Sequence, residues 1–220
     1  MAATTQMTEG IRSQASPGAG PAVARRGLLV SLAVALALPS AKADNLHGRV
    51  GPVRPPVTVP DLDVVSSDGQ RRQLRDMLAG RVSAVQLMFS HCRSICPIEA
   101  ATFARVQEAL AGDLTGRIQL VSLSIDPASD TPEVLKAWLQ RFGAHQGWDA
   151  VAPAIKDLAL VRRFFDQGSG FGEDHSTAMY VFDSDARLVW RSSELPAPDD
   201  VARLLIGLNR RLAGAPSSRL

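Results

Sequence analysis

Two cysteines four residues apart, Cys92 and Cys96, are the only cysteines in the 220-residue chain and the residues best suited to chemistry. On a helix, positions four apart have Cβ atoms roughly 5–6 Å apart, and a metal with bonds of about 2.3 Å to sulfur, the zinc value, spans that gap. A disulfide needs Cβ atoms about 3.8 Å apart, within reach if Cys92 lies just outside the helix. A loop this short stabilises a fold weakly, which argues against a purely structural disulfide. The spacing therefore permits a soft thiolate site suited to copper(I), or a redox pair.

The cysteine motif lies between a predicted buried strand and a predicted helix. Val82–Phe89 is apolar and partly β-branched, as expected of a buried strand. Pro97 suits the first turn of a helix, and Glu99 suits the positive end of the helix dipole. Because the N–H groups and dipole at a helix N-terminus favour negative charge, we expect a cysteine here to have a lowered pKa and substantial thiolate character.

A third metal ligand would come from the histidines, and residue types and spacing do not select one of them. The chain has four: His47, His91, His145 and His175. Neighbouring side chains at a strand end tend to point apart, which disfavours His91 beside Cys92. His175 lies in a loop before a predicted strand, and such a loop can carry a ligand over a helix N-terminus. An ordinary loop histidine remains the alternative for His175 at this point.

Strands and helices follow one another along the rest of the chain. Apolar β-branched runs predict strands, and apolar residues three to four apart, with capping residues, predict helices. The further predicted strands are Val57–Val65, Ile118–Ile125, Met179–Phe182 and Ala186–Arg191. The further predicted helices are Gln73–Leu78, Pro132–Phe142 with Thr131 as its N-cap, Ile155–Phe165 and Asp199–Leu212. This order predicts an α/β protein with a thioredoxin-like fold, in which helices flank both faces of a central mixed β-sheet.

The first 43 residues have the pattern of a secretory signal peptide. Arg25-Arg26 precedes the apolar run Gly27–Leu38, and Ala41-Lys42-Ala43 has the small residues of a cleavage site. The run has 12 residues, too few for a hydrocarbon core that needs about 20. We therefore expect cleavage near Ala43 and a periplasmic protein, rather than a retained membrane anchor. The paired arginines leave twin-arginine and Sec export equally open.

The basic character of the chain belongs to this leader. The formal net charge is +2, and residues 1–43 carry four basic residues and one acid, so subtracting their +3 leaves −1 for the rest. No basic run remains after the leader, which argues against a nucleic-acid partner. The predicted organisation is a signal peptide (1–43), a linker (44–56), one thioredoxin-like domain (57–213) and a flexible tail (214–220), with no membrane span in the mature chain and a monomeric state.

Three sequence blocks together resemble the Sco/SenC family. They are Cys92-x-x-x-Cys96-Pro97, then Ser124-Ile125-Asp126-Pro127 leading to Asp130-Thr131-Pro132, then Asp174-His175-Ser176. The resemblance covers Val57 to Leu212. It implies a thioredoxin-like fold and a copper ion, Cu(I) or Cu(II), bound by Cys92, Cys96 and His175. It also implies a role in building the dinuclear copper centre of cytochrome c oxidase, as a copper donor to an oxidase subunit, as a reductant of the receiving cysteines, or both.

Two departures from the family leave the recipient of the copper open. Family members often have Pro-Asp between the cysteines, whereas this chain has Arg93-Ser94-Ile95, and the charge of Arg93 should favour a thiolate. Many members are membrane-anchored, whereas the leader here is expected to be cleaved. Delivery to another periplasmic copper protein therefore remains an option.

A thiol–disulfide oxidoreductase is the alternative function for the same pair. Cys92 would attack a target disulfide and Cys96 would resolve the mixed disulfide, without a metal and without His175. A peroxidase is disfavoured, because Phe89 and Arg93 stand three residues before the cysteines, where a peroxidatic cysteine has Thr or Ser.

Overall fold

The computed structural model describes residues 50–110, 116–166 and 176–214, with side chains as far as Arg211. The predicted signal peptide, the last six residues and His175 lie outside these ranges. Within them, one mixed sheet of eight strands has the order β1-β8-β7-β4-β5-β6-β2-β3. The strands are β1 (Gly51–Thr58), β2 (Asp63–Ser66), β3 (Arg71–Gln73), β4 (Val82–Met88), β5 (Ile118–Ser124), β6 (Trp148–Pro153), β7 (Ala178–Phe182) and β8 (Arg187–Glu194).

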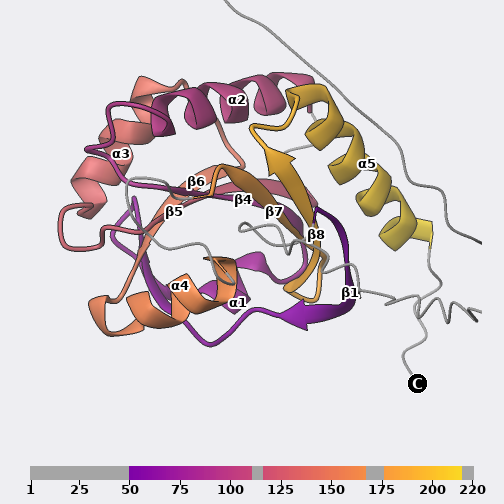
Figure 1. The fold of residues 1–220 in the computed structure, drawn as a ribbon, viewed down its shortest axis with the longest axis horizontal. Helices are drawn as coiled ribbons and strands as arrows, with labels where there is room; N and C mark the ends of the chain where they lie inside the picture. Colours follow the sequence, from indigo (N-terminus) through magenta and orange to yellow (C-terminus); the bar gives the residue numbers. More distant parts are fainter. Residues whose placement is uncertain (1–49, 111–115, 167–175, 215–220) are drawn as a thin grey trace, which may run out of the picture. The chain divides into compact units, whose positions relative to one another are not determined.

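Helices cover both faces of this sheet, as the sequence predicted (Figure 1). They are α1 (Leu74–Leu78), α2 (Cys96–Ala109), α3 (Pro132–Arg141), a 3₁₀ turn (Ile155–Asp157), α4 (Leu158–Asp166) and α5 (Pro198–Gly214). Figure 1 shows α2, α3 and α5 on one face and α1 and α4 on the other. Strand β5 runs parallel to β4 and to β6, whereas the other paired strands are antiparallel, so the sheet is mixed.

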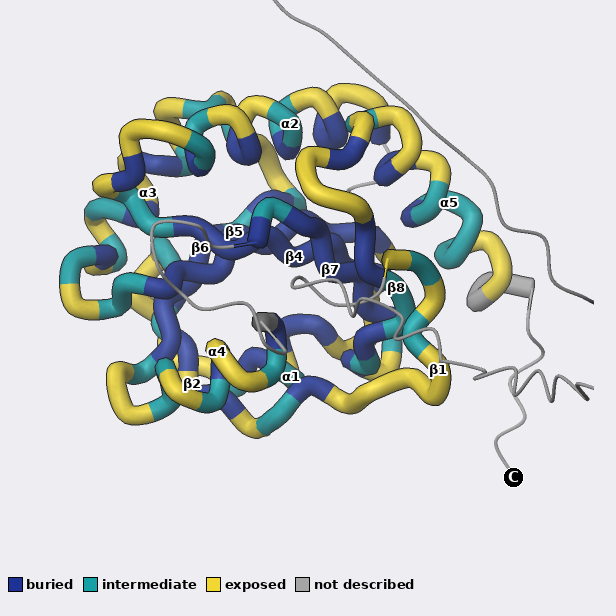
Figure 2. The backbone as a smooth tube through the Cα atoms, in the orientation of Figure 1, coloured by how far each residue is buried: buried dark blue, intermediate teal, exposed yellow. Residues whose placement is uncertain are grey.

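The central strands β4 and β5 are buried along their whole length, which explains their nearly continuous apolar sequences (Figure 2). The polar side chains that they bury are bonded to one another across the strands. Gln119 donates to the Ser83 hydroxyl at 2.8 Å, and Gln86 donates to the Ser122 hydroxyl at 2.9 Å. These pairs offset part of the cost of burying polar groups in the sheet.

Several strands differ from the sequence-based expectation. The predicted strand Val57–Val65 is divided between the end of β1 and β2, and β3 has no predicted counterpart. Residues 51–56, expected to belong to the linker, form most of β1, which pairs antiparallel with β8 through Gly51, Pro52, Val57 and Thr58. The prolines that suggested a linker are tolerated because β1 is an edge strand. Strand β6 has no counterpart in the prediction, since its sequence WDAVAP lacks a β-branched run.

The boundaries of α3 agree closely with the prediction. The Thr131 hydroxyl accepts a hydrogen bond from the Val134 N–H at 3.4 Å, as an N-cap does, and Pro132 follows at the first helical position. Gly143 has φ of +66° just beyond the helix, a conformation that favours glycine. Side-chain capping and glycine chemistry therefore set both ends of this helix.

Candidate metal centre

The loop between β4 and α2 carries both cysteines. Cys92 follows the end of β4 and its N–H donates to the Phe89 carbonyl at 3.2 Å, whereas Cys96 is the first residue of α2, with Pro97 in its first turn. Cys92 is 8% exposed and Cys96 is 0% exposed. Both cysteines are reduced in the structure. A buried strand and the start of a long helix thus fix the pair from both sides.

The sulfur of Cys92 is held as an anion by hydrogen bonds. The Cys96 backbone N–H donates to it at 3.3 Å, and the Ser94 hydroxyl lies 3.7 Å away. Burial acts to raise the pKa of Cys92, but hydrogen bonds from the Cys96 thiol, the Cys96 and Ser94 N–H groups and the Ser94 hydroxyl outweigh it and lower the pKa to about 6. Cys92 is therefore a thiolate at neutral pH, although it lies four residues before the first residue of α2. The lowered pKa of Cys92 is thus attributed to these hydrogen bonds. Arg93, expected from the sequence to favour the thiolate, has an exposed side chain and is not among the groups that lower this pKa.

Cys96 has the opposite protonation behaviour. Burial raises its pKa well above the ordinary range, and its hydrogen bond to the Cys92 sulfur raises it further. The Phe89 backbone hydrogen bond lowers it, but by less. At neutral pH Cys92 is therefore a thiolate, and Cys96 is a thiol that donates a hydrogen bond to it. Such a pair fits a soft cation that two thiolates can hold, and it fits a disulfide equally well.

A buried acid, Glu99, lies one helical turn beyond Cys96. Its side chain is 2% exposed, and neither of its carboxyl oxygens has a hydrogen-bond partner in the described part of the chain. Burial raises the pKa of Glu99 to about 9, and the charges of Cys92 and Glu194 add to this effect. The sequence placed Glu99 correctly in the first turn, but gave no sign that it is buried beside the thiolate.

Asp130 ties the cysteine loop to the end of β5. This carboxylate is 1% exposed and accepts hydrogen bonds from the Ser124 hydroxyl at 2.6 Å and from the Ser90 N–H at 3.2 Å. Asp126 makes the expected turn, since its carbonyl accepts from the Asp130 N–H at 3.0 Å. The sequence indicated a turn and a helix start here, but a contact between residues 40 apart has no local signal.

Glu194, at the end of β8, holds the two residues that follow His175 in the sequence. Its carboxylate accepts from the Ser176 hydroxyl at 3.0 Å, from the Thr177 N–H at 2.5 Å and from the Thr177 hydroxyl. Sequence reasoning missed Glu194, because its partners lie 17 and 18 residues away, just before the neighbouring strand β7.

The structure brings two of the three predicted copper ligands together. Cys92 and Cys96 are in contact, whereas His175 lies outside the described residues and its place is not determined. Of the other histidines, His91 and His145 are exposed, and His47 lies outside the described ranges. No group of three or more His, Cys, Asp or Glu residues that could hold a metal occurs among the described residues alone.

Comparisons with known proteins point to one family. The family model SCO1/SenC matches residues 53–208. A putative copper-binding protein from Stutzerimonas stutzeri is 32% identical over 124 residues, 54% of this chain and 60% of the relative. The mitochondrial protein SCO2 of Saccharomyces cerevisiae is 29% identical over 120 residues, 51% of this chain and 40% of the relative. The matches thus span about half the length of these curated relatives.

Solved structures confirm the thioredoxin-like fold. A SCO1/SenC family lipoprotein from Bacillus anthracis superposes with a TM-score of 0.60 at 24% identity, over 71% of this chain and 99% of that one. Yeast Sco1 with copper bound gives a TM-score of 0.60 at 18% identity, over 74% of this chain and 98% of that one.

Proposed function

Because this chain belongs to the SCO1/SenC family, we propose that it is a periplasmic copper metallochaperone whose ligands are Cys92, Cys96 and His175. The observation that carries the proposal is the buried pair of sulfurs at the start of α2, one of them ionised. Two sulfur ligands suit copper(I), and a histidine as third ligand suits either oxidation state. Copper is the cargo of such a protein rather than a permanent cofactor.

The protonation states of the two cysteines suggest how copper is taken up and released. The Cys92 thiolate is available to capture the cation without losing a proton. Cys96 has to lose its proton as the second bond forms, so uptake of copper(I) releases one proton. Because the pKa of Cys96 is high, its thiolate is readily protonated again once copper leaves. This protonation favours release of the copper to a recipient that binds it with its own thiolates.

A competition experiment tests this proposal. Reduced protein should take up one copper(I) per chain against a chelator, Cys92→Ala and Cys96→Ala should abolish uptake, and His175→Ala should weaken it. His145→Ala is the matched control, because His145 is exposed and is not a predicted ligand. Reduced wild-type protein that takes up no copper would refute the function.

We propose the recipient to be a copper-receiving protein such as a subunit of cytochrome c oxidase. Support comes from the family and from the structurally similar protein BsSco, which is described as a member of the Sco family of cytochrome c oxidase assembly proteins. Among the described residues, no helix is long and apolar enough to span a bilayer. Mass measurement of the exported protein would test cleavage near Ala43, and sedimentation would test the predicted monomer.

A thiol–disulfide oxidoreductase remains the second candidate, because the pair also has the asymmetry that exchange needs. The Cys92 thiolate would attack a target disulfide and release one target thiolate, and Cys96 would then displace the second. This reaction does not require His175. Reductase activity that survives His175→Ala and is lost in Cys92→Ser, together with weak copper binding, would favour this function.

A further inference from the structure

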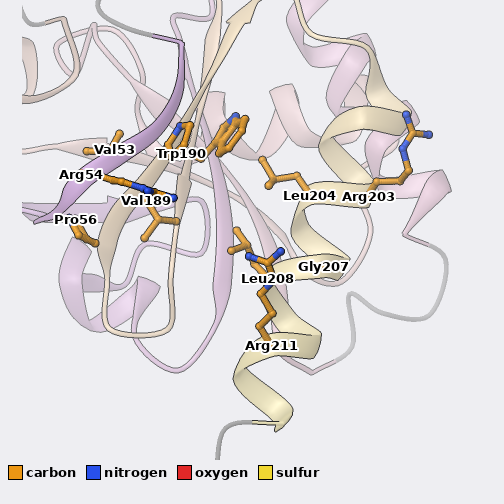
Figure 3. Close-up of a pocket in the computed structure, with 11 residues that line it drawn as sticks. Val53, Arg54, Pro56, Val189, Trp190, Arg203, Leu204, Gly207, Leu208 and Arg211 are labelled. Atoms are coloured by element: carbon orange, nitrogen blue, oxygen red, sulfur yellow. The ribbon is translucent and has the colours of Figure 1, made fainter.

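A groove at the β1 edge of the sheet, on the face that α5 shares with α2, is lined by neither cysteine. It has a volume of about 600 Å³ and lies between α5 and the edge formed by β1 and β8 (Figure 3). The cysteine loop follows β4, which is the fourth strand from that edge. The apolar lining residues are Pro52, Val53, Pro56, Val189, Trp190, Leu204 and Leu208. An occupant of this groove would therefore leave the copper site open.

Three arginines line the groove and no acidic residue does. Arg203 pairs with Asp200 and points away from the strands in Figure 3. Arg54 and Arg211 form no ion pair within the described residues, and Figure 3 shows them on opposite walls, on β1 and α5. Two unneutralised guanidinium groups beside an apolar floor favour an occupant that is both apolar and anionic.

Several occupants do not fit this chemistry. The basic leader would be repelled, since its net charge is +3, and a second copy packed groove against groove would bring the same arginines together. A peptide cannot extend the sheet readily, because Pro52, Pro55 and Pro56 remove N–H donors from β1. Apart from guanidinium groups and the Trp190 indole, the lining side chains offer no hydrogen-bonding group. A hydrocarbon chain needs none.

We propose that this groove binds an anionic phospholipid at the surface of a bilayer. The acyl chain would lie against Trp190 and Leu208, and the phosphate would lie between Arg54 and Arg211. Tryptophan and arginine are the side chains expected at the level of the lipid headgroups. The bound lipid would hold the domain at a membrane while the cysteine loop remains accessible.

Trp190 provides a local reporter of binding. It is partly exposed in the groove, whereas Trp138 and Trp148 are each only 3% exposed. Brominated acyl chains quench tryptophan fluorescence on contact, so vesicles of brominated phosphatidylglycerol should quench Trp190 in the full chain. Trp190→Phe should remove the signal. All variants keep the same leader, so its own affinity for vesicles is common to every comparison.

Charge and shape variants test the site. Arg54→Gln with Arg211→Gln should weaken vesicle binding, measured by quenching, roughly 30-fold, at about fivefold per lost basic residue. Arg117→Gln with Arg210→Gln is the matched control, because both residues are exposed and outside the groove. Gly207→Leu should block the groove and still fold, since a Cβ at Gly207 meets nothing within 4 Å and leucine favours a helix.

The outcomes separate the proposal from its rivals. The proposal is supported if brominated phosphatidylglycerol quenches more strongly than brominated phosphatidylcholine and if this quenching falls only in the groove variants. No quenching, equal quenching by both lipids, or equal loss in the control variant overturns it. Occupancy by monomeric dodecyl phosphate, or by an acidic amphipathic peptide, without quenching by vesicles would also overturn it.

Discussion

The backbone N–H of Cys96 donates a hydrogen bond to the sulfur of Cys92 over 3.3 Å. The first residue of α2 thus stabilises negative charge on the cysteine four positions before it, while its own buried thiol stays protonated. Two residues of the same type therefore have different chemistry, because one accepts hydrogen bonds and the other is enclosed.

The first prediction concerns the reactivity of the two thiols with pH. In Cys96→Ser, which keeps the backbone N–H but replaces the thiol that also donates to Cys92, the alkylation rate of Cys92 should still rise at a lower pH than for an ordinary thiol, since the thiolate is the nucleophile and the remaining hydrogen bonds lower its pKa. In Cys92→Ser, Cys96 should react only at strongly alkaline pH. Iodoacetamide rates with mass detection give both profiles. Matching profiles in the two folded variants would contradict the asymmetry, and the unfolded chains serve as reference, with both thiols near pKa 8.5.

The second prediction concerns Glu99 and the pH dependence of stability. Its pKa is raised from 4.5 to about 9 on folding, so its contribution is fully present below pH 4.5 and is lost as the pH rises towards 9. The loss approaches about 1.4 kcal/mol per pH unit between these values. Glu99→Gln should remove this slope from the free energy of unfolding, measured with urea at pH 5 and pH 8. Glu108→Gln is an exposed control on the same helix, and an unchanged slope in Glu99→Gln would refute the assignment.

The third prediction concerns the anchor of the cysteine loop. Asp130→Ala removes the acceptor of the Ser124 and Ser90 hydrogen bonds, and should lower the free energy of unfolding by about 2 kcal/mol. Amide exchange at Ser90 should also become faster. Asp76→Ala, at an exposed position in α1, is the control for removing a carboxylate. Equal effects of the two substitutions would show that Asp130 anchors nothing.

The fourth prediction concerns Glu194, which binds the residues after His175. If His175 is a ligand, Glu194→Ala should lower copper affinity roughly tenfold, as loss of a supporting contact does. The same substitution in a His175→Ala background should cause no further loss of affinity. Chelator competition on the four proteins completes the cycle. Equal losses in both backgrounds would mean that Glu194 acts only on general stability, which thermal unfolding would show independently.

Local sequence signals predicted most elements because the responsible interactions are local. Thr131 caps α3 through a residue three positions away, and the apolar run of β4 needs no distant partner to be recognised. Strand β6 was missed because its pairing with β5 and β2, rather than its own sequence, makes it a strand. The prolines of β1 led to the wrong prediction of a linker for the same reason. Only the order of strands in the sheet shows that β1 is an edge strand, where prolines are tolerated.

The cysteine pair was predictable in the same way, whereas its surroundings were not. Four-residue spacing before a proline places Cys96 at a helix start with Cys92 just before it. The expected lowering of the pKa occurs at Cys92 alone, because burial raises the pKa of Cys96. Burial of Glu99 and the contacts of Asp130 and Glu194 depend on segments far apart in the sequence. The third ligand, His175, rests on family resemblance alone and stays a prediction.

Absorption spectroscopy of copper(II) titrated into reduced protein tests the central claim most directly. We predict a thiolate-to-copper charge-transfer band that saturates at one equivalent, is absent in Cys92→Ala and Cys96→Ala, and changes in energy or intensity in His175→Ala. A band that is unaltered by His175→Ala would contradict the three-ligand site, and no band in the wild-type protein would contradict the copper site itself.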